Sequence, residues 1–157
     1  MRGRRSRSWP STRFQGRTKR ISPHLGRAPD EPINQELAKF YGRLLGVLRL
    51  PAPRQGEWRL LECVPAWEGN WTWDCFLAFA WQAPEGDPLL VAVNYAGNQS
   101  QCYVRPPLAD LGKHQWRLTD LLGDATYDRD GGDLQRRGLY LDVAPWQASV
   151  FSLQRRG

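Results

Sequence analysis

Apolar side chains recur every three or four residues over positions 34–49, in the sequence NQELAKFYGRLLGVLR. This spacing predicts an amphipathic helix, because residues so spaced lie on one face of a helix. Asn34 is a suitable N-cap, and the prolines of PAPRQG end the pattern. We expect the apolar face either to pack against another domain or to fold back onto the rest of the chain. Its predicted interdomain packing residues are Leu37, Tyr41, Leu44 and Leu48.

From Trp58 onward the hydrophobic period shortens from about 3.6 residues to two, which predicts β-strands. Gly, Pro, Asn and Asp residues separate the alternating runs, as is typical of turns. Seven or eight short strands with no helix among them favour an antiparallel β-sandwich or barrel. We expect a Greek-key sandwich. The expected strands are residues 58–64, 73–82, 89–95, 100–105, 114–119, 138–143 and 147–153, with a shorter one at 126–128.

The stretch GNWTWDCFLAFAW, residues 69–81, is dense in aromatic side chains. Alternation along a strand places Cys75, Leu77 and Phe79 on one face, which we expect to be the core face, with Phe79 and Trp81 packed inside. The loop before the strand has a different character, because large aromatic rings there can stack on the C–H faces of sugars. The candidate carbohydrate-contact residues are Trp67, Asn70 and Trp71, and the alternative for the two tryptophans is packing against another domain or against the loop.

The formal net charge of +6 belongs to the start of the chain. The first 29 residues contain nine Arg or Lys and no Asp or Glu, whereas acidic side chains outnumber basic ones in the rest. Nucleic-acid binding needs a basic face, so we expect no such role for the body of the chain. The start is compatible with a transit peptide or with an RNA- or membrane-surface arm. We expect residues 1–13 to be a disordered basic tail.

We expect a cytoplasmic protein without a membrane span, because no apolar stretch approaches about eighteen residues and the start lacks the apolar segment of a secretory signal. Cys63, Cys75 and Cys102 have neither a CxxC spacing nor a nearby histidine, which favours buried, reduced thiols over a zinc site. The segment YDRDGGDL lacks the frame of a calcium loop and is expected to form a hairpin turn. The sequence predicts no cofactor and no metal site.

The chain resembles, from about Phe14 to Leu153, the C-terminal part of enzymes of the α-amylase family, glycoside hydrolase family 13. The segment RFQGRTKRISPHLGRAPDEPINQELAKFYGRLLGVLRL is similar to the end of the catalytic barrel in that family. The segments LLVAVNYAGNQSQCYVRPP, QWRLTDLLGDATYDRDG and GLYLDVAPWQASVFSL follow in the order seen in its C-terminal β-sandwich. The resemblance implies a remnant of the end of a (β/α)8 barrel at residues 14–55 and a C-terminal sandwich domain at residues 56–157.

The same resemblance indicates what this sequence does not contain. The family's enzymes are retaining glycosidases or transglycosylases, whose chemistry needs two carboxylates about 5 Å apart. None of the motifs that carry these carboxylates can be placed on this sequence. We therefore expect a non-catalytic accessory domain of an α-glucan-active enzyme. Its expected partner is a catalytic barrel domain or a separately encoded barrel chain, with an α-glucan as a further partner. The alternative is a stand-alone carbohydrate-binding module that uses exposed tryptophans.

Overall fold

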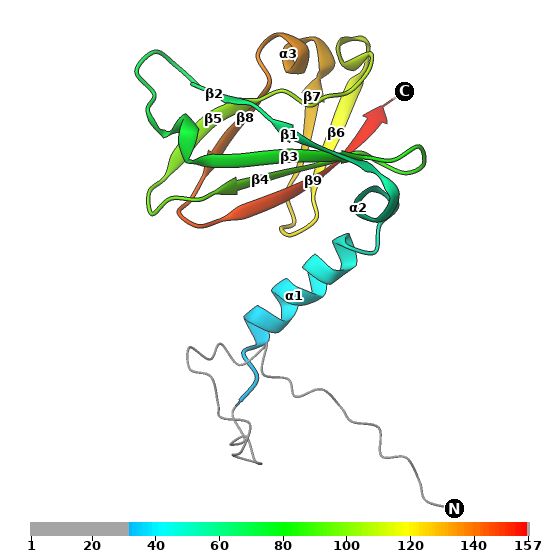
Figure 1. Ribbon diagram of the computed structural model, residues 1–157, viewed down its shortest axis with the longest axis vertical. Coiled ribbons are helices and arrows are strands. Elements are labelled where there is room, and N and C mark those ends of the chain that lie inside the picture. Colours follow the sequence, from blue (N-terminus) through cyan, green and yellow to red (C-terminus); the bar gives the residue numbers. More distant parts are fainter. Residues whose placement is uncertain (1–31, 157) are drawn as a thin grey trace, which may run out of the picture. The chain divides into compact units, whose positions relative to one another are not determined.

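The computed structural model describes residues 32–156, drawn in colour in Figure 1. The expected tail at residues 1–13 lies outside this range. The chain divides into two compact units, one up to Arg43 and one from Leu44 onward, and the sandwich belongs to the second. The helices are α1 (Gln35–Val47), α2 (Pro51–Gln55) and α3 (Gly131–Arg136), with 3-10 turns η2 (Thr72–Cys75) and η3 (Leu111–Lys113). The strands are β1 (Glu57–Leu61), β2 (Cys63–Val64), β3 (Phe76–Gln82), β4 (Leu89–Asn94), β5 (Ser100–Val104), β6 (Gln115–Asp120), β7 (Thr126–Asp130), β8 (Leu139–Val143) and β9 (Ala148–Arg156).

Two antiparallel sheets form the sandwich, which confirms the predicted fold class. The larger sheet has the strand order β1-β3-β4-β9-β6-β7, and the smaller has the order β2-β5-β8. The last strand, β9, therefore lies inside the larger sheet, where it pairs with β4 on one side and with β6 on the other. Figure 1 shows the two layers, with β5 and β8 behind β3 and β4.

The main hydrophobic core fills the space between the two sheets. The smaller sheet contributes Cys102, Val104 and Leu141, and the larger one contributes mostly small or branched side chains that are almost fully buried. Those from the larger sheet are Ala78, Leu90, Ala92, Trp116, Leu118, Phe151 and Leu153. The indole Nε1 of Trp116 donates a hydrogen bond to the Leu111 carbonyl, 2.9 Å away, so its polar group is satisfied inside the core.

The face of β3 that was predicted to lie in the core is the outer face of the sheet, and the residues one position along form the core face. The strand begins at Phe76, because Thr72–Cys75 forms a 3-10 turn in place of the strand predicted from residue 73. Ala78 and Ala80 face inward and are buried, while Leu77 is 47% exposed. A one-residue slip exchanges the two faces of a strand. Sequence alternation could not decide between the faces, since both carry apolar side chains.

Two other expected elements also differ from the structure. The expected strand at 58–64 is two strands, because the chain leaves the larger sheet after Leu61 and enters the smaller one at Cys63. The expected hairpin turn in YDRDGGDL is the start of helix α3. Asp130 caps this helix by accepting a hydrogen bond from the Asp133 backbone N–H at 3.0 Å. A Cβ at Gly131 would clash with backbone carbonyl oxygens of η3 and of the residue after it, so glycine suits this close approach.

Helix α1 confirms the predicted cap and comes close to the predicted bounds. The Asn34 Oδ1 accepts a hydrogen bond from the Leu37 backbone N–H at 3.0 Å, as expected for an N-cap. The helix ends at Val47, two residues before the expected boundary. Pro51 then starts α2, where its missing N–H costs nothing at a first helical position. No helix within residues 32–156 is long and apolar enough to cross a membrane.

Asn94, at the end of β4, links two loops from inside the protein. Its side chain is fully buried, and its Nδ2 donates to the carbonyl oxygens of Asn98, Val143 and Ala144 at 2.8–3.0 Å. Its Oδ1 accepts from the Ala96 backbone N–H at 3.2 Å. One amide thus satisfies backbone groups of the β4–β5 loop and of the turn between β8 and β9.

Replacing Asn94 with Ala should lower the free energy of unfolding by about 2–4 kcal/mol, because several buried backbone groups would lose their partner. Urea denaturation followed by circular dichroism measures this change. Asn98→Ala is the matched control, because the Asn98 Nδ2 bonds only locally, to Gln99 and Ser100, and its loss should cost at most about 1 kcal/mol. Equal losses in the two variants would contradict the linking role of Asn94.

Candidate functional site

Over β1, β3, β4 and the start of β9, the outer face of the larger sheet is apolar, like its core face. Directly paired residues on neighbouring strands point to the same face of a sheet. One row across four strands consists of Leu60, Phe79, Val91 and Val150. The rows on either side of it contain Trp58, Trp81 and Leu89, and Leu77, Val93 and Ala148. A sheet that is apolar on both faces needs a cover on both.

Part of this outer face is covered by the segment that precedes β1. A second hydrophobic cluster buries Leu89, Val91 and Val150 together with Val47 and Ala52. Val47 ends α1 and Ala52 lies in α2, so the sequence just before the sandwich supplies the cover. Phe79 and Trp81 pack against this cluster, so they are packed, but on the outer face of the sheet and not inside the main core as predicted.

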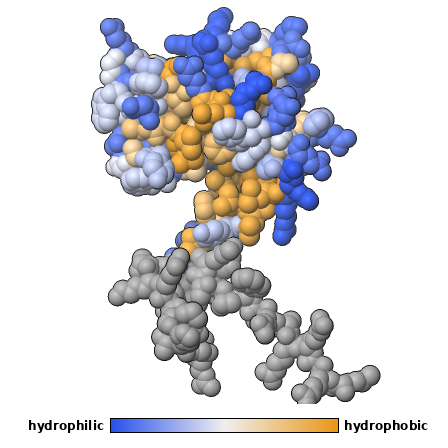
Figure 2. All heavy atoms as spheres, in the orientation of Figure 1, coloured by the Kyte–Doolittle hydropathy of each residue, from blue (hydrophilic) through white to orange (hydrophobic). Residues whose placement is uncertain are grey.

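The rest of the outer face is open. We call Trp58, Leu60 and Leu77 the docking face, because all three lie on the outer rows and are about half exposed. The half-buried Phe79 ring lies next to Trp58 on the same face, and the centroids of the two rings are 6.0 Å apart. Figure 2 shows apolar residues gathered in the middle of the sandwich, where Figure 1 places β1 and β3. A contiguous apolar patch of this kind is typical of an interaction surface.

The residues predicted for interdomain packing share one face of α1. Leu37, Tyr41 and Leu44 are half-buried, and Leu48, just after the helix, is exposed. The buried residue of the helix is Val47, which the apolar spacing did not single out. Within the unit that begins at Leu44, the helix end therefore presents Leu48 as a further exposed apolar side chain and anchors itself through Val47.

The three predicted carbohydrate-contact residues lie together in the segment before η2, but in different environments. Trp67 and Trp71 are exposed, Trp71 by 70%. Asn70 is buried, with 6% of its surface accessible. Its Oδ1 accepts from the Ala66 backbone N–H at 3.1 Å, and its Nδ2 donates to the Thr72 hydroxyl at 2.9 Å. Asn70 therefore holds the loop in shape, and the two tryptophans are the exposed groups.

A chain of polar contacts extends from this loop across the outer face of the smaller sheet. The Thr72 hydroxyl accepts from the Gln101 backbone N–H at 3.0 Å and lies 3.3 Å from the Gln101 Oε1. The Gln101 Nε2 donates to the Asp142 Oδ1 at 3.0 Å, and the Gln99 Nε2 donates to the same oxygen at 2.6 Å. We call this set, which consists of Asn70, Thr72, Gln99, Gln101 and Asp142, the polar ladder. Sequence reasoning missed it, because its members pair across strands far apart in the chain.

Two tyrosines lie beside the polar ladder on the same face. Tyr103 of β5 and Tyr140 of β8 are paired in register, with ring centroids 5.5 Å apart. Tyr140 is exposed, and partial desolvation together with the negative charge of Asp142 raises the pKa of its phenol. The phenol therefore stays protonated at neutral pH and can donate a hydrogen bond. The alternation of GLYLDV could have indicated an outward Tyr and Asp pair, but not their neighbours on β5.

Past the β8 edge this face continues into a groove between the two sheets. The groove has a volume of about 250 Å³, and Asp142 and Tyr140 lie at one wall of it. Tyr127 and Arg129 of β7 also line it, with the guanidinium carbon of Arg129 5.1 Å from the centroid of the Tyr127 ring. The groove therefore offers aromatic surface, a positive charge and a negative charge at close quarters.

A further aromatic pair, Tyr95 and Trp146, was not predicted as a surface feature. Both rings are more than two-thirds exposed, and their centroids lie 5.7 Å apart in an edge-to-face arrangement. Trp146 has a φ of 58°, which is unusual for a residue other than glycine. Its turn is held by Asn94 through the Ala144 carbonyl. In the sequence of this turn, Pro145 is the one residue whose type is typical of turns.

The cysteines and the acidic side chains provide no metal centre within residues 32–156, where no three ligand-type side chains cluster. Cys63 and Cys102 are buried free thiols, as predicted, whereas Cys75 is only half-buried. A hydrogen bond from the Cys102 thiol lowers the pKa of Cys63. The same contact, together with burial, raises the pKa of Cys102.

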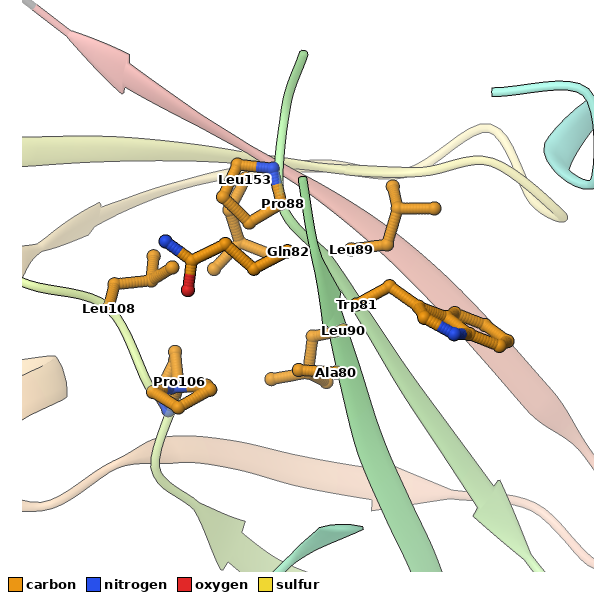
Figure 3. A pocket seen from close by; sticks show the side chains of 10 residues that line it. Ala80, Trp81, Gln82, Pro88, Leu89, Leu90, Pro106, Leu108 and Leu153 are labelled. Atoms are coloured by element: carbon orange, nitrogen blue, oxygen red, sulfur yellow. The ribbon is translucent and has the colours of Figure 1, made fainter. Parts of the chain in front are cut away.

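Figure 3 shows a pocket where the segment after β5 crosses the β3–β4 hairpin. Gln82, Pro106 and Leu108 point into it, whereas Trp81 points away toward the outer face of the sheet. The space is only about 10 Å³, which holds at most about one water molecule. The pocket is a packing gap and offers no room for a substrate.

No protein-family model and no curated protein sequence matches this chain. The chain has a distant structural likeness to MutB. An inactive double mutant of MutB in complex with isomaltulose aligns with a TM-score of 0.45 and 17% identity over 75% of this chain. A mutant of the trehalulose synthase MutB in complex with Tris gives the same values. This chain spans 18% of the length of those proteins, and the likeness is too distant to assign an activity to it.

Replacing Val47 with Asp should lower the free energy of unfolding of the sandwich by about 1.5–3 kcal/mol, the value of burying one such side chain. The carboxylate would force the helix end off the second hydrophobic cluster. Leu48→Asp is the matched control, since Leu48 is exposed, and its effect should stay within about 0.5 kcal/mol. Thermal and urea denaturation measure both values, and equal effects would show that Val47 does not anchor the helix.

Proposed function

We propose that this chain is an accessory C-terminal β-sandwich of an α-amylase-family glycosidase acting on α-glucans, and that it is not catalytic by itself. Its role is to pack against a catalytic barrel, either as part of one chain or as a separate subunit. The observation that carries the proposal is the docking face, an apolar surface on the side of the larger sheet that faces away from the sandwich core.

The chemistry of the docking face fits a protein surface better than a small ligand. Trp58, Leu60 and Leu77 provide apolar area, and the neighbouring rows carry no charged side chain on β3 or β4. Large aromatic and aliphatic side chains are typical of the centre of a stable protein interface. Burying these three would stabilise a complex by about 1.5–3 kcal/mol each at full exposure, and by less here because they are only half exposed.

A catalytic barrel is the proposed occupant because of the sequence that leads into the sandwich. The segment before α1 and α1 itself resemble the end of a family 13 barrel, and AWEGNWTWDCFLAFAW and the three sandwich segments named above follow in family order. The helix end and α2 already cover one part of the outer face, so a barrel that carried this helix would meet the sheet beside them. Carboxylates for the glycosidic chemistry would then come from the barrel.

Pull-down with the full chain as bait, from a lysate of the organism that encodes it, tests this proposal. Mass spectrometry should find a protein that carries the catalytic carboxylates of an α-amylase-type barrel. The double variant Leu60→Asp, Leu77→Asp should lose at least about tenfold of that enrichment, because charge on the docking face opposes burial. A Tyr140→Ala bait, altered on the other sheet, should retain it. Absence of any glycosidase, or equal capture by the docking-face variant, would contradict the proposal.

A second candidate function is that of a carbohydrate-binding module which uses the loop before η2. The exposure of Trp67 and Trp71, on a loop that the buried Asn70 fixes, favours it. Rigid aromatic side chains lose little conformational freedom on binding, which suits them to stacking against sugar rings.

Titration of maltoheptaose into the purified chain tests the second function. Binding should release heat and quench tryptophan fluorescence, and Trp71→Ala should weaken it by roughly tenfold, or about 1.4 kcal/mol. Trp58→Ala is the control, because it removes another exposed indole, 55% accessible against 70% for Trp71, from the docking face. The module hypothesis fails if the chain gives neither heat nor quenching, or if both variants behave alike.

A further inference from the structure

The two outer faces of the sandwich have opposite chemical character. The larger sheet presents an apolar surface, whereas the smaller sheet presents tyrosine rings, amides and a carboxylate. A protein that docks through the first face leaves the second one free. The smaller sheet is therefore available for a ligand of different chemistry.

We infer that the outer face of the smaller sheet binds a neutral oligosaccharide, with Tyr140 as a stacking platform and with Asp142 and Gln101 as hydrogen-bonding groups. This site adds to the proposed accessory role and does not depend on it, because it lies on the other layer of the sandwich. It is also distinct in its residues from the tryptophan loop.

The arrangement of aromatic and polar groups carries this inference. Tyr103 and Tyr140 form a ring pair 5.5 Å apart, directly beside the row that pairs Gln101 with Asp142. A sugar presents an apolar C–H face and a rim of hydroxyl groups, so it can contact both rows at once. The carboxylate of Asp142 is a strong acceptor for hydroxyl groups, and hydrogen bonds to a charged group are about twice as strong as neutral ones.

The polar ladder holds these groups in place before a ligand arrives. Gln99 and Gln101 both donate to one oxygen of Asp142, and Gln101 is fixed in turn by Thr72. The buried Asn70 holds Thr72 from the other side. Asn70 and Thr72 are thus positioning residues, and the pre-formed ladder reduces the entropy that a ligand must overcome.

The groove beside β8 favours a neutral ligand over an ionic one. Its 250 Å³ lies next to Tyr140 and Asp142, so an oligosaccharide stacked on the face could extend a sugar unit into it. Arg129 on one wall and Asp120 and Asp142 among the other lining residues place both signs of charge around this space. A purely anionic or cationic ligand would meet like charge there, whereas hydroxyl groups can donate to the carboxylates and accept from the guanidinium.

Nuclear magnetic resonance titration of the full chain with maltoheptaose, and separately with isomaltulose, tests the inference. The side-chain amide signals of Gln99 and Gln101 and the backbone signals of β8 should shift on binding at least one of the two sugars. Tyr140→Ala and Asp142→Ala should each weaken that binding by roughly tenfold, which corresponds to about 1.4 kcal/mol. Both side chains are exposed, so the variants should keep the fold, and dispersed spectra verify this.

Tyr95→Ala is the matched control, since it removes an exposed tyrosine elsewhere on the sandwich and should leave the affinity unchanged. Shifts confined to the indoles of Trp67 and Trp71, with unchanged affinity in the Tyr140 variant, would overturn the inference and support the loop module. No shift with either sugar at tens of millimolar would overturn both sugar sites. Neither result bears on barrel docking, which the pull-down measures separately.

Discussion

The structure depends on one sheet that is apolar on both faces. Toward the smaller sheet it presents Ala78, Leu90 and Leu153, which form the main core, and away from it Phe79 and Val91. An antiparallel sheet commonly leaves one face in water, but on β3 and β4 the outer face of this one is as apolar as its core face, and polar side chains such as Arg117 and Asp128 occupy it on β6 and β7. The helix end and α2 cover part of the second face, and the uncovered remainder is the surface on which the proposed accessory role rests.

Buried asparagines perform the second structural task, which is to fix loops that carry exposed aromatic rings. Asn94 joins two loops beside Tyr95 and Trp146, and Asn70 shapes the loop of Trp67 and Trp71. In both places a small amide satisfies backbone or hydroxyl groups that would otherwise be buried without partners. The loops that carry these rings are therefore held in shape by buried hydrogen bonds, which lowers the entropy lost when the rings bind a ligand.

Local signals predicted most elements, and contacts between distant residues account for what they did not predict. The Asn34 cap and the turn residues placed the helix and almost every strand, because these features depend on a few neighbours in sequence. The inner face of β3 was missed because apolar residues occupy both faces of that strand. The polar ladder pairs Thr72, Gln101 and Asp142 across three segments, and no sequence period encodes such a set. Trp67 and Trp71 were singled out from the loop character of their segment, whereas the burial of Asn70 was not predicted.

The central place of β9 has a consequence for how the molecule is made. Strands β4 and β6 do not pair with each other, because β9, the last strand of the sandwich, lies between them and pairs with both. During synthesis on the ribosome, the larger sheet thus stays in two parts until Ala148–Arg156 has emerged. A chain terminated before that strand would hold two unpaired inner edges, which invite intermolecular pairing.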